Sequence, residues 1–367
     1  MGKKNTSHNS FSGIIKFLLL CLQSVVFILL CASGYSGMFH PSNHPWLVSL
    51  GLAFGPILLV YCGCTLLWLL IDFRWFINSL LGLLICGVPI RTFFPINFSK
   101  LNEEEAYVKV LSYNVDTFGK GIVENKTEIY DFIHHSAADI VCLQEGGYNS
   151  SERPTIDSVM SLWAYKDTTL FLYNTLSLYT HYPIIDKCIV KGPDIQHGAI
   201  IYRLKKDNDT LIVINSHFSS NNISVDDKNV FKDVVTQPTK EDTKSNIHYL
   251  ARKVDDAGIH RARQADTLIK YIKTLGNVPI IMCGDFNDSP LSYVHFQLTR
   301  ILNDSYTRGG NGPGISYHEG GMYFRIDNIL CSDHWNVAKS KVCNRVNGSD
   351  HYPICSWLQL NSDKSKH

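Results

Sequence analysis

The sequence of residues 278–290 is VPIIMCGDFNDSP, an apolar run that ends in two polar side chains, Asp285 and Asn287. Short apolar runs of this kind, bounded by Pro and Gly, are typical of buried strands. Gly-Asp by itself is ordinary turn chemistry, so this segment alone assigns no function. Its importance lies in repetition, because similar arrangements recur between residues 105 and 360.

Apolar runs alternate with polar loops through residues 105–360, and this alternation predicts short strands with helices between them. Besides 278–283, the strand-like runs are residues 107–113, 140–143, 170–173, 200–204, 210–215 and 325–331. The helical candidates are residues 123–135 and residues 261–275, the second with an apolar face. Residues 219–258 are polar with no strong period before residue 247, so we expect a surface excursion near the site.

Polar side chains stand at the ends of these runs and come from distant parts of the chain. Besides Asp285 and Asn287, they are Asn114, Glu145, His217, Asp327, Asp350 and His351. A rigid sheet scaffold can bring such residues together in one site. Taken singly, each of them also has a purely structural explanation, such as a turn cap or a loop pair.

Taken together, these residues form a known series of motifs. The motifs are Ser-Tyr-Asn114, Leu-Gln-Glu145, Asn-Ser-His217, Gly-Asp285-Phe-Asn287, Arg-Ile-Asp327 and Ser-Asp350-His351. Their order resembles the endonuclease/exonuclease/phosphatase superfamily of DNase I-like nucleases, abasic-site endonucleases, neutral sphingomyelinases and inositol-polyphosphate 5-phosphatases. The stretch from Arg261 to Gln264 also resembles the Arg-x-x-Gln helix of that family. The resemblance covers about residues 105–360 and implies a four-layer α/β sandwich, in which helices flank two mixed β-sheets.

The resemblance implies a divalent metal site. Glu145 is the expected ligand, and Asn114 and Asp350 would complete the shell directly or through water. Mg²⁺ is the expected ion, with Mn²⁺ as an alternative, because hard cations prefer oxygen ligands and Mg²⁺ keeps several waters.

The resemblance also implies roles in phosphoester hydrolysis for the remaining residues. Asp285 would act on the attacking water, and Asn287 would donate to the phosphate. His217 would contact a phosphate oxygen or assist the leaving group. His351 would contact the phosphoryl group while Asp327 holds its ring, so we expect a hydrogen bond between these two side chains. Either Asp285 or His351 could take the proton.

Residues 1–100 differ from the rest of the chain in charge and hydropathy. They hold six basic side chains and one acidic side chain, a balance of +5, against −4 for residues 101–367. Apolar segments at residues 17–34, 46–71 and 75–90 predict about three transmembrane helices. We therefore expect a membrane anchor over residues 1–100 and the catalytic domain over residues 101–367, an arrangement that resembles uncharacterised bacterial membrane proteins.

The distribution of Lys and Arg predicts the orientation. Lys3, Lys4 and Lys16 precede the first segment, whereas residues 35–45 contain no Lys or Arg. The positive-inside rule then places the N-terminus in the cytoplasm, and three crossings of the cell (inner) membrane place the catalytic domain outside. If the short third segment is re-entrant, the domain is cytoplasmic. A cleaved signal peptide is the alternative for the first segment.

The expected partners are a lipid bilayer and a phosphoester substrate, either nucleic acid or a lipid or inositol phosphate. The −4 balance of the domain excludes a strongly basic, non-specific nucleic-acid binder. The sequence implies no protein partner. The alternative function is a catalytically inactive, membrane-tethered binding module of the same fold.

Overall fold

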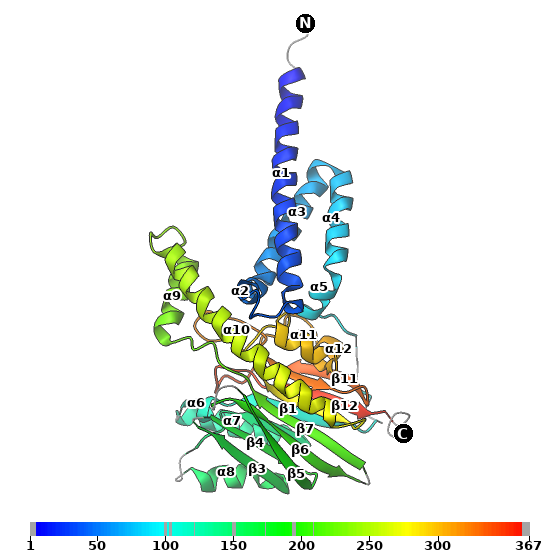
Figure 1. Cartoon of the computed structure of the whole chain (residues 1–367), viewed down its shortest axis with the longest axis vertical. Helices are drawn as coiled ribbons and strands as arrows, with labels where there is room; N and C mark the ends of the chain where they lie inside the picture. Colours follow the sequence, from blue (N-terminus) through cyan, green and yellow to red (C-terminus); the bar gives the residue numbers. More distant parts are fainter. Residues whose placement is uncertain are drawn as a thin grey trace.

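The structure, a computed structural model, describes residues 5–98, 101–102, 105–120, 122–148, 152–172, 174–192, 196–207 and 209–361, with side chains from residue 13 onward. A bundle of helices forms one end of an elongated molecule, and an α/β domain forms the other (Figure 1). The predicted boundary at residue 100 itself lies outside the described residues.

Two six-stranded mixed sheets form the centre of the domain. The first has the order β11-β12-β1-β2-β4-β3, and the second has the order β5-β6-β7-β8-β10-β9. The strands are β1 (Val108–Asn114), β2 (Ile140–Gln144), β3 (Tyr165–Phe171), β4 (Asn174–Thr180), β5 (Ile184–Lys191), β6 (Gly198–Lys206), β7 (Asp209–His217), β8 (Ile280–Asp285), β9 (Asn303–Asp304), β10 (Asp327–Cys331), β11 (Trp335–Val342) and β12 (Ile354–Leu360). One central pair in each sheet is parallel, β1 with β2 and β7 with β8.

The strands alternate their buried side chains between two cores, as the pleat of a strand requires. Val110 and Val213 lie in the core between the sheets, whereas Leu111 packs on the outer side of the first sheet. Helices α7 (Val123–His135) and α8 (Arg153–Val159) cover that outer side. Helices α10 (Thr243–Thr274) and α11 (Tyr293–Thr299) cover the second sheet. The result is the four-layer α/β sandwich that the sequence predicts.

Two predicted elements have wrong bounds. The helix expected at residues 261–275 begins at Thr243, so the surface excursion expected at residues 219–258 contains α9 (Val225–Thr236) and the first half of α10. This part of the chain projects from the domain (Figure 1), and α10 has no buried residue before Ala257, so no strong apolar period marks it. The strand expected at residues 170–173 is misplaced, since β3 ends at Phe171 and residue 173 is outside the described residues.

The bundle consists of α1 (Asn5–Gly34), η1 (Ser36–Met38), α2 (Trp46–Leu52), α3 (Phe54–Ile71), α4 (Phe73–Ile85) and α5 (Gly87–Phe93). Two segments, Gly13–Gly34 and Phe54–Ile71, are long and apolar enough to cross a membrane. The pair α4 and α5, bent by 65°, would be a third crossing if it counts as one span. The apolar run at residues 46–71 divides at Ala53, because Pro56 would clash with the carbonyl of Leu52 in a continuous helix.

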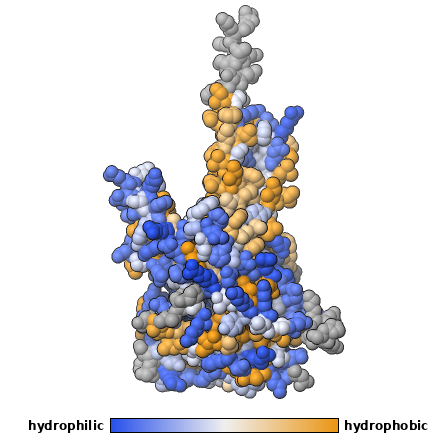
Figure 2. All heavy atoms as spheres, in the orientation of Figure 1, coloured by the Kyte–Doolittle hydropathy of each residue, from blue (hydrophilic) through white to orange (hydrophobic). Residues whose placement is uncertain are grey.

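Polar side chains bond to one another inside the bundle. Gln23 Nε2 of α1 donates to Ser79 Oγ of α4 (2.6 Å), and the indole of Trp68 in α3 donates to Gln23 Oε1. Many leucines of the bundle face outward instead: Leu70 is 83% exposed and Leu84 is 76% exposed. Figure 2 shows the apolar surface gathered on these helices, above a largely polar domain. Interhelical polar bonds within an apolar exterior are typical of membrane helices.

We call the contact region between the bundle and the domain the junction. Leu291, which follows β8, packs against Leu30 and Phe54 of the bundle. Ser36 Oγ donates to the carbonyl of Leu291 (3.2 Å), and the buried Arg325 donates to the carbonyl of Thr92. These contacts hold the bundle against the two domain segments that lead from β8 and into β10.

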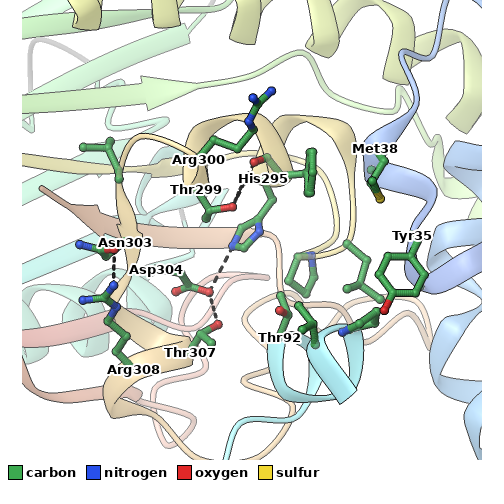
Figure 3. Close-up of a pocket in the computed structure, with 18 residues that line it drawn as sticks. Tyr35, Met38, Thr92, His295, Thr299, Arg300, Asn303, Asp304, Thr307 and Arg308 are labelled. Carbon is green, nitrogen blue, oxygen red and sulfur yellow. Dashed lines mark hydrogen bonds and ion pairs between the residues drawn. The ribbon is translucent and has the colours of Figure 1, made fainter. Parts of the chain in front are cut away.

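Helix α10 makes a second set of contacts with the bundle. The backbone N–H of Ser49 in α2 donates to Asp255 Oδ1 (2.9 Å), and Gly258 lies against Val48. A cavity of about 370 Å³ lies elsewhere in the junction, between α5, η1 and α11 (Figure 3).

Candidate active site

The sheet topology places the polar strand ends at one edge of the sandwich. In the second sheet, His217, Asp285 and Asp327 are register partners on the neighbouring strands β7, β8 and β10. In the first sheet, β1 ends at Asn114 and the parallel β2 ends one residue before Glu145. The loop into β12, which is antiparallel to β1, returns Asp350 and His351 to the same edge.

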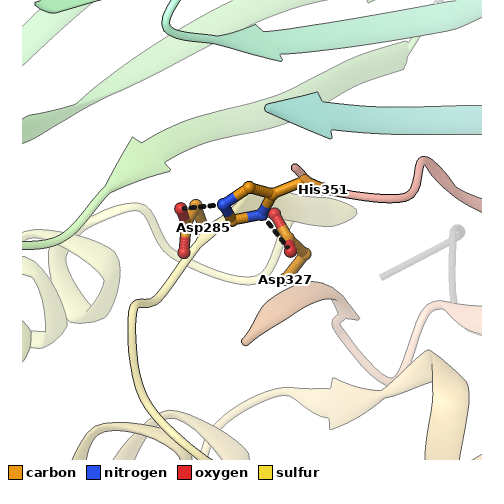
Figure 4. A group of neighbouring side chains, drawn as sticks. All are labelled: Asp285, Asp327 and His351. Carbon is orange, nitrogen blue, oxygen red and sulfur yellow. Dashed lines mark hydrogen bonds and ion pairs between the residues drawn. The ribbon is translucent and has the colours of Figure 1, made fainter. Parts of the chain in front are cut away.

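His351 lies between two buried carboxylates (Figure 4). Its Nδ1 donates to Asp327 Oδ2 (2.8 Å), which confirms the expected hydrogen bond. Its Nε2 lies 3.7 Å from Asp285 Oδ2 and 4.0 Å from Asp350 Oδ1. Asp327 therefore fixes the ring so that Nε2 faces the other two carboxylates.

Asn114 joins the two sheets at this edge. Its Nδ2 donates to Glu145 Oε1 (3.0 Å) and to Asp285 Oδ2 (3.0 Å). The Glu145 side chain is 37% exposed, whereas that of Asp285 is 1% exposed. Glu145 is also held at a φ of 55°, in the left-handed region that is costly for a residue with a Cβ. Such strain is typical of functional sites.

His217 is enclosed by amides. Asn174 contacts its Nδ1, and Asn287 Nδ2 lies 3.1 Å from its Nε2. The same Nε2 lies 3.5 Å from Asp285 Oδ2 and 3.7 Å from Glu145 Oε1. All eight residues that the sequence singles out therefore form one connected network, through direct contacts of 4.0 Å or less.

A left-handed turn that the sequence did not reveal completes the edge. Residues 116–120, labelled α6 (Asp116–Lys120), all have positive φ, from 42° at Asp116 to 73° at Gly119. The turn brings Lys120 Nζ within 3.1 Å of Asp116 Oδ2. Burial and the neighbouring Asp350 carboxylate raise the pKa of Asp116 to about 6.

The site carries an excess of negative charge. Burial and the Asp327 carboxylate raise the pKa of Asp285 to about 7, although His351 opposes the shift. Burial also raises the pKa of Asp350. For His351, burial lowers the pKa, but Asp327 and Asp285 outweigh it and raise the pKa well above its usual value. Carboxylates this close to one another repel each other when they are charged. A bound cation would relieve that repulsion, so the site is a suitable environment for one.

Two sets of residues could hold that cation. Ligand atoms of Asp285, Asp327 and His351 all lie within 4.8 Å of one another. Because His351 Nδ1 and Asp327 Oδ2 are bonded to each other, this set would offer His351 Nε2 and the other oxygen of Asp327 to a cation, and all three residues are buried. Glu145 is the most exposed carboxylate of the network, at 37% against 20% for Asp350, and it lies beside Asn114, so it fits a partly hydrated ion better.

Helix α10 braces the loops that carry the site. Arg261 Nε donates to Asp288 Oδ2 (3.0 Å), and its Nη1 donates to the carbonyl of Ser219 (3.2 Å). Gln264 Oε1 accepts from the N–H of Ser219 (2.9 Å). The stretch from Arg261 to Gln264 thus ties the loop after β7 to the loop after β8.

A small polar cavity of about 200 Å³ opens beside Glu145 and His217. Thr117, Asn174 and His197 are among its lining residues, and the His197 ring meets the His217 ring edge to face at 5.0 Å. Asn174 and His197 were missed because they belong to no motif. The one sequence signal for these residues was their place at the beginning of a strand. Asn174 is the first residue of β4, and His197 directly precedes Gly198, the first residue of β6.

Comparisons with known proteins agree with this architecture. A family model described as the Endonuclease/Exonuclease/phosphatase family matches residues 111–351. A model described as a domain of unknown function (DUF8431) matches residues 16–93, which include most of the bundle. No curated protein matches the chain.

Solved structures share the fold at low sequence identity. The human Nocturnin catalytic domain is 16% identical, with a TM-score of 0.52 over 72% of this chain and 98% of that one. Truncated TDP2 from Caenorhabditis elegans is 14% identical, with a TM-score of 0.50 over 69% of this chain and 98% of that one. A Bacteroides vulgatus endonuclease/exonuclease/phosphatase is 16% identical, with a TM-score of 0.50 over 70% of this chain and all of that one. With the family model and the shared fold in agreement, the chain belongs to the endonuclease/exonuclease/phosphatase family.

Proposed function

We propose that the protein is a membrane-anchored phosphoesterase that depends on a divalent metal, Mg²⁺ or Mn²⁺. The observation that carries the proposal is the network at one sheet edge, which joins all eight polar strand-end residues across two sheets. Members of this family generally hydrolyse phosphoester bonds and generally use a divalent metal. Residues 1–100 would be the anchor, and residues 101–367 the catalytic domain.

Glu145 would hold the metal, with Asn114 and Asp350 beside it. Bound there, the metal would neutralise charge on the phosphoryl oxygens and on the leaving oxygen. Asn114 already links Glu145 to Asp285, so it would keep the metal ligand and the catalytic carboxylate in a fixed relation.

The other residues would transfer the proton or stabilise negative charge on the phosphoryl group. His351 has a raised pKa, so it would keep a proton on Nε2 and donate it in a hydrogen bond to a phosphoryl oxygen. Asp285 would then be the group that orients and deprotonates the attacking water, because its pKa of about 7 suits a general base. His217 and Asn287, which contact each other, would bind a phosphoryl oxygen or the leaving group.

The cavity beside Glu145 bears on the substrate. Of the described residues that line it, none is Lys or Arg, and most carry neutral polar groups. Such a lining suits one ring with hydroxyl groups better than a group with several phosphates. A phosphodiester with a single small polar leaving group, from a lipid headgroup or a nucleotide, fits best.

The bundle supports the anchoring. Helix α3 has 18 residues, about 27 Å at 1.5 Å per residue, close to the thickness of a hydrocarbon core of about 30 Å. Lys16 and Asp72 pair at 2.8 Å, and the N-terminal end of α1 lies away from the domain (Figure 1). With α4 and α5 as one span, the N-terminus and the domain would face opposite sides of the cell (inner) membrane. The positive-inside rule makes the domain side extracytoplasmic.

The proposal is tested by Glu145→Gln in the full chain, purified in a neutral detergent. Plasmid DNA, RNA, sphingomyelin and phosphoinositides are offered with Mg²⁺, and release of product is followed. Turnover on whichever substrate is cleaved should fall at least about 100-fold, the scale of losing a main electrostatic stabiliser. Glu241→Gln, on the exposed surface, is the matched control and should be unchanged. Wild-type turnover by Glu145→Gln in limiting Mg²⁺ would show that the assignment is wrong.

A further inference from the structure

Two cysteines flank the loop that carries Asp350 and His351. Cys343 directly follows β11, and Cys355 is the second residue of β12, so the segment 344–354 between them contains both site residues. The Sγ atoms of the two cysteines lie 3.9 Å apart. Neither thiol belongs to the network of the candidate active site, so the proposed hydrolysis gives them no role.

The pairing of β11 with β12 brings the two thiols together. Lys341 is the register partner of Cys355, and the backbone N–H of Cys343 donates to the carbonyl of Pro353 (2.8 Å), so the ladder continues past the end of β11. Cys343 therefore lies two residues from the position opposite Cys355, on the same face of the sheet. Side chains in this diagonal relation are within reach of each other.

The two thiols differ in their access to solvent. Cys355 is 3% exposed and packs in the core that contains Leu111, whereas Cys343 lies half-buried at the rim of that core. An oxidant can therefore reach Cys343, and Cys355 lies directly behind it. A partly exposed thiol beside a second thiol is the usual arrangement of a redox-sensitive pair.

Lysines surround the more exposed thiol. Lys109 and Lys339 are register partners of Trp357 on its two neighbouring strands, and their Nζ atoms lie 4.9 and 5.5 Å from the centre of its ring. The thiol of the partner cysteine and the nearby ammonium groups, that of Lys341 among them, lower the pKa of Cys343 against the effect of burial. Because the thiolate is the nucleophile in disulfide exchange, these surroundings favour reaction at Cys343.

We propose that Cys343 and Cys355 are a redox-active pair, which a small disulfide such as oxidised glutathione converts into an intramolecular disulfide bond. The Cys343 thiolate attacks one sulfur of the oxidant, so a mixed disulfide forms and one glutathione thiolate leaves. The Cys355 thiolate then attacks Cys343 Sγ and releases the second glutathione. Two electrons and two protons pass from the pair to the oxidant, which leaves as two thiols.

The bond would close at the base of the loop that carries His351. A disulfide bond is about 2.05 Å long, so the two Sγ atoms would approach each other by about 1.9 Å from their separation of 3.9 Å. The N–H of Cys343 is bonded to the carbonyl of Pro353, two residues after His351, so the covalent link acts next to the candidate active site. The link should restrict the loop, and the chemistry of the pair depends neither on the proposed catalysis nor on the membrane anchoring.

The experiment is thiol mapping of the full chain in a neutral detergent. The protein is equilibrated with mixtures of reduced and oxidised glutathione, free thiols are blocked with iodoacetamide, and peptides are identified by mass spectrometry. We expect a disulfide-linked peptide pair that contains Cys343 and Cys355, with a linked fraction that rises with the share of oxidised glutathione. Hydrogen exchange of residues 344–353 should be slower in the oxidised protein than in the reduced protein.

Two variants separate the two steps of the reaction. Cys355→Ser should trap Cys343 as a stable mixed disulfide with glutathione, whereas Cys343→Ser should leave the buried Cys355 as a free thiol. Cys188→Ser, which removes an exposed cysteine of β5, is the control and should not change the linked fraction.

Three results would overturn the inference. They are free thiols at both cysteines in every glutathione mixture, a bond from Cys343 to a different cysteine, and the absence of a mixed disulfide at Cys343 in Cys355→Ser. Unchanged exchange of residues 344–353 in an oxidised protein would refute the effect on the loop. None of these measurements uses turnover, so a failure of the proposed catalysis would be seen separately.

Discussion

The bundle and the α/β domain both bury apolar side chains, but they expose different kinds of surface. In the bundle, Gln23 and Ser79 are buried and hydrogen-bonded, while Leu84 is 76% exposed. In the domain, Val110 and Val213 are fully buried between the sheets. A leucine that is largely exposed therefore has a different meaning in each region: it is an isolated surface residue in the domain and a part of a continuous apolar surface in the bundle. One chain is folded for two solvents, and the two meet at the junction.

The largest expected effect tests the domain alone. Asp327→Asn removes the carboxylate that fixes the His351 ring, and Asp327 contacts neither solvent nor the cavity beside Glu145. We expect kcat to fall roughly 100-fold or more, with KM little changed, because positioned acid–base groups contribute about that much. Steady-state kinetics of the full chain measure both constants, with Asp256→Asn on the exposed face of α10 as the control. A change in KM alone would contradict the positioning role.

The next largest effect is a loss of stability at the junction. Asp304 is 4% exposed and bonds to His295, with Arg325 nearby. Asp304→Asn should destabilise the protein by about 3–5 kcal/mol, because it leaves a buried Arg325 without its carboxylate. Thermal unfolding in detergent measures the loss.

The difference in stability between wild type and Asp304→Asn should depend on pH, and the direction of this dependence can be predicted. Burial alone would raise the pKa of Asp304, but His295 and Arg325 outweigh it and hold the pKa below its usual range. A depressed folded-state pKa contributes stability above the unfolded value of about 3.9 and loses it as the pH falls through the folded value. The gap between wild type and Asp304→Asn should therefore be constant from pH 7 to about 5 and narrow below about pH 4. A gap that widens on acidification would contradict the assignment.

A matched pair of exposed leucines, one in the bundle and one in the domain, tests whether the two surfaces face different solvents. Leu84 in α4 and Leu170 in β3 are 76% and 71% exposed. Leu84→Lys should disfavour membrane insertion by about 2.5–3.5 kcal/mol. Leu170→Lys should change domain stability by no more than about 0.5 kcal/mol. The carbonate-resistant fraction of each variant is the measurement, and equal behaviour of the two would mean that the bundle surface is not lipid-facing.

The smallest effect concerns the bundle interior. Gln23→Leu removes the hydrogen bonds to Ser79 and Trp68 but keeps an apolar side chain of similar size. Polar bonds between membrane helices contribute about 0.6 kcal/mol on average, so the thermal unfolding temperature should fall only slightly and turnover should not change. Loss of the protein from the membrane fraction would show that the interior bonds, rather than the apolar surface, hold the bundle together.

The sequence predicted the sandwich and its polar edge because strand-end residues carry both local and global information. Asp285 ends an apolar run and stands in a motif, and its register partner Asp327 also stands in a motif, at the start of the antiparallel strand β10. Asn174, His197 and Asp116 could not be found in this way. They enter the site through the pairing of β4, through the start of β6 and through an unusual turn, which are properties of the assembled sheets.

The helical parts were predicted less well, for two reasons. Helix α9 and the first half of α10 have few buried positions, so no apolar period marks them. The apolar run at residues 46–71 has uniform hydropathy, which hides the break that Pro56 imposes. Helix α2, on the near side of that break, packs on α10 through Val48 and Gly258, and a hydropathy pattern carries no information about such a contact.

The left-handed turn at residues 116–120 has a consequence for how the protein tolerates mutation. Four of its five residues carry a Cβ, and each pays roughly 1–2 kcal/mol to stay in that region. Their sum is of the same order as the whole net stability of a typical domain, about 5–15 kcal/mol. The core that contains Leu111 must therefore be stable enough to hold the turn in place. Phe118 of the turn is 1% exposed and packs in the same core as Leu111, so substitutions that weaken this core are expected to disturb the geometry around Asp116 as well.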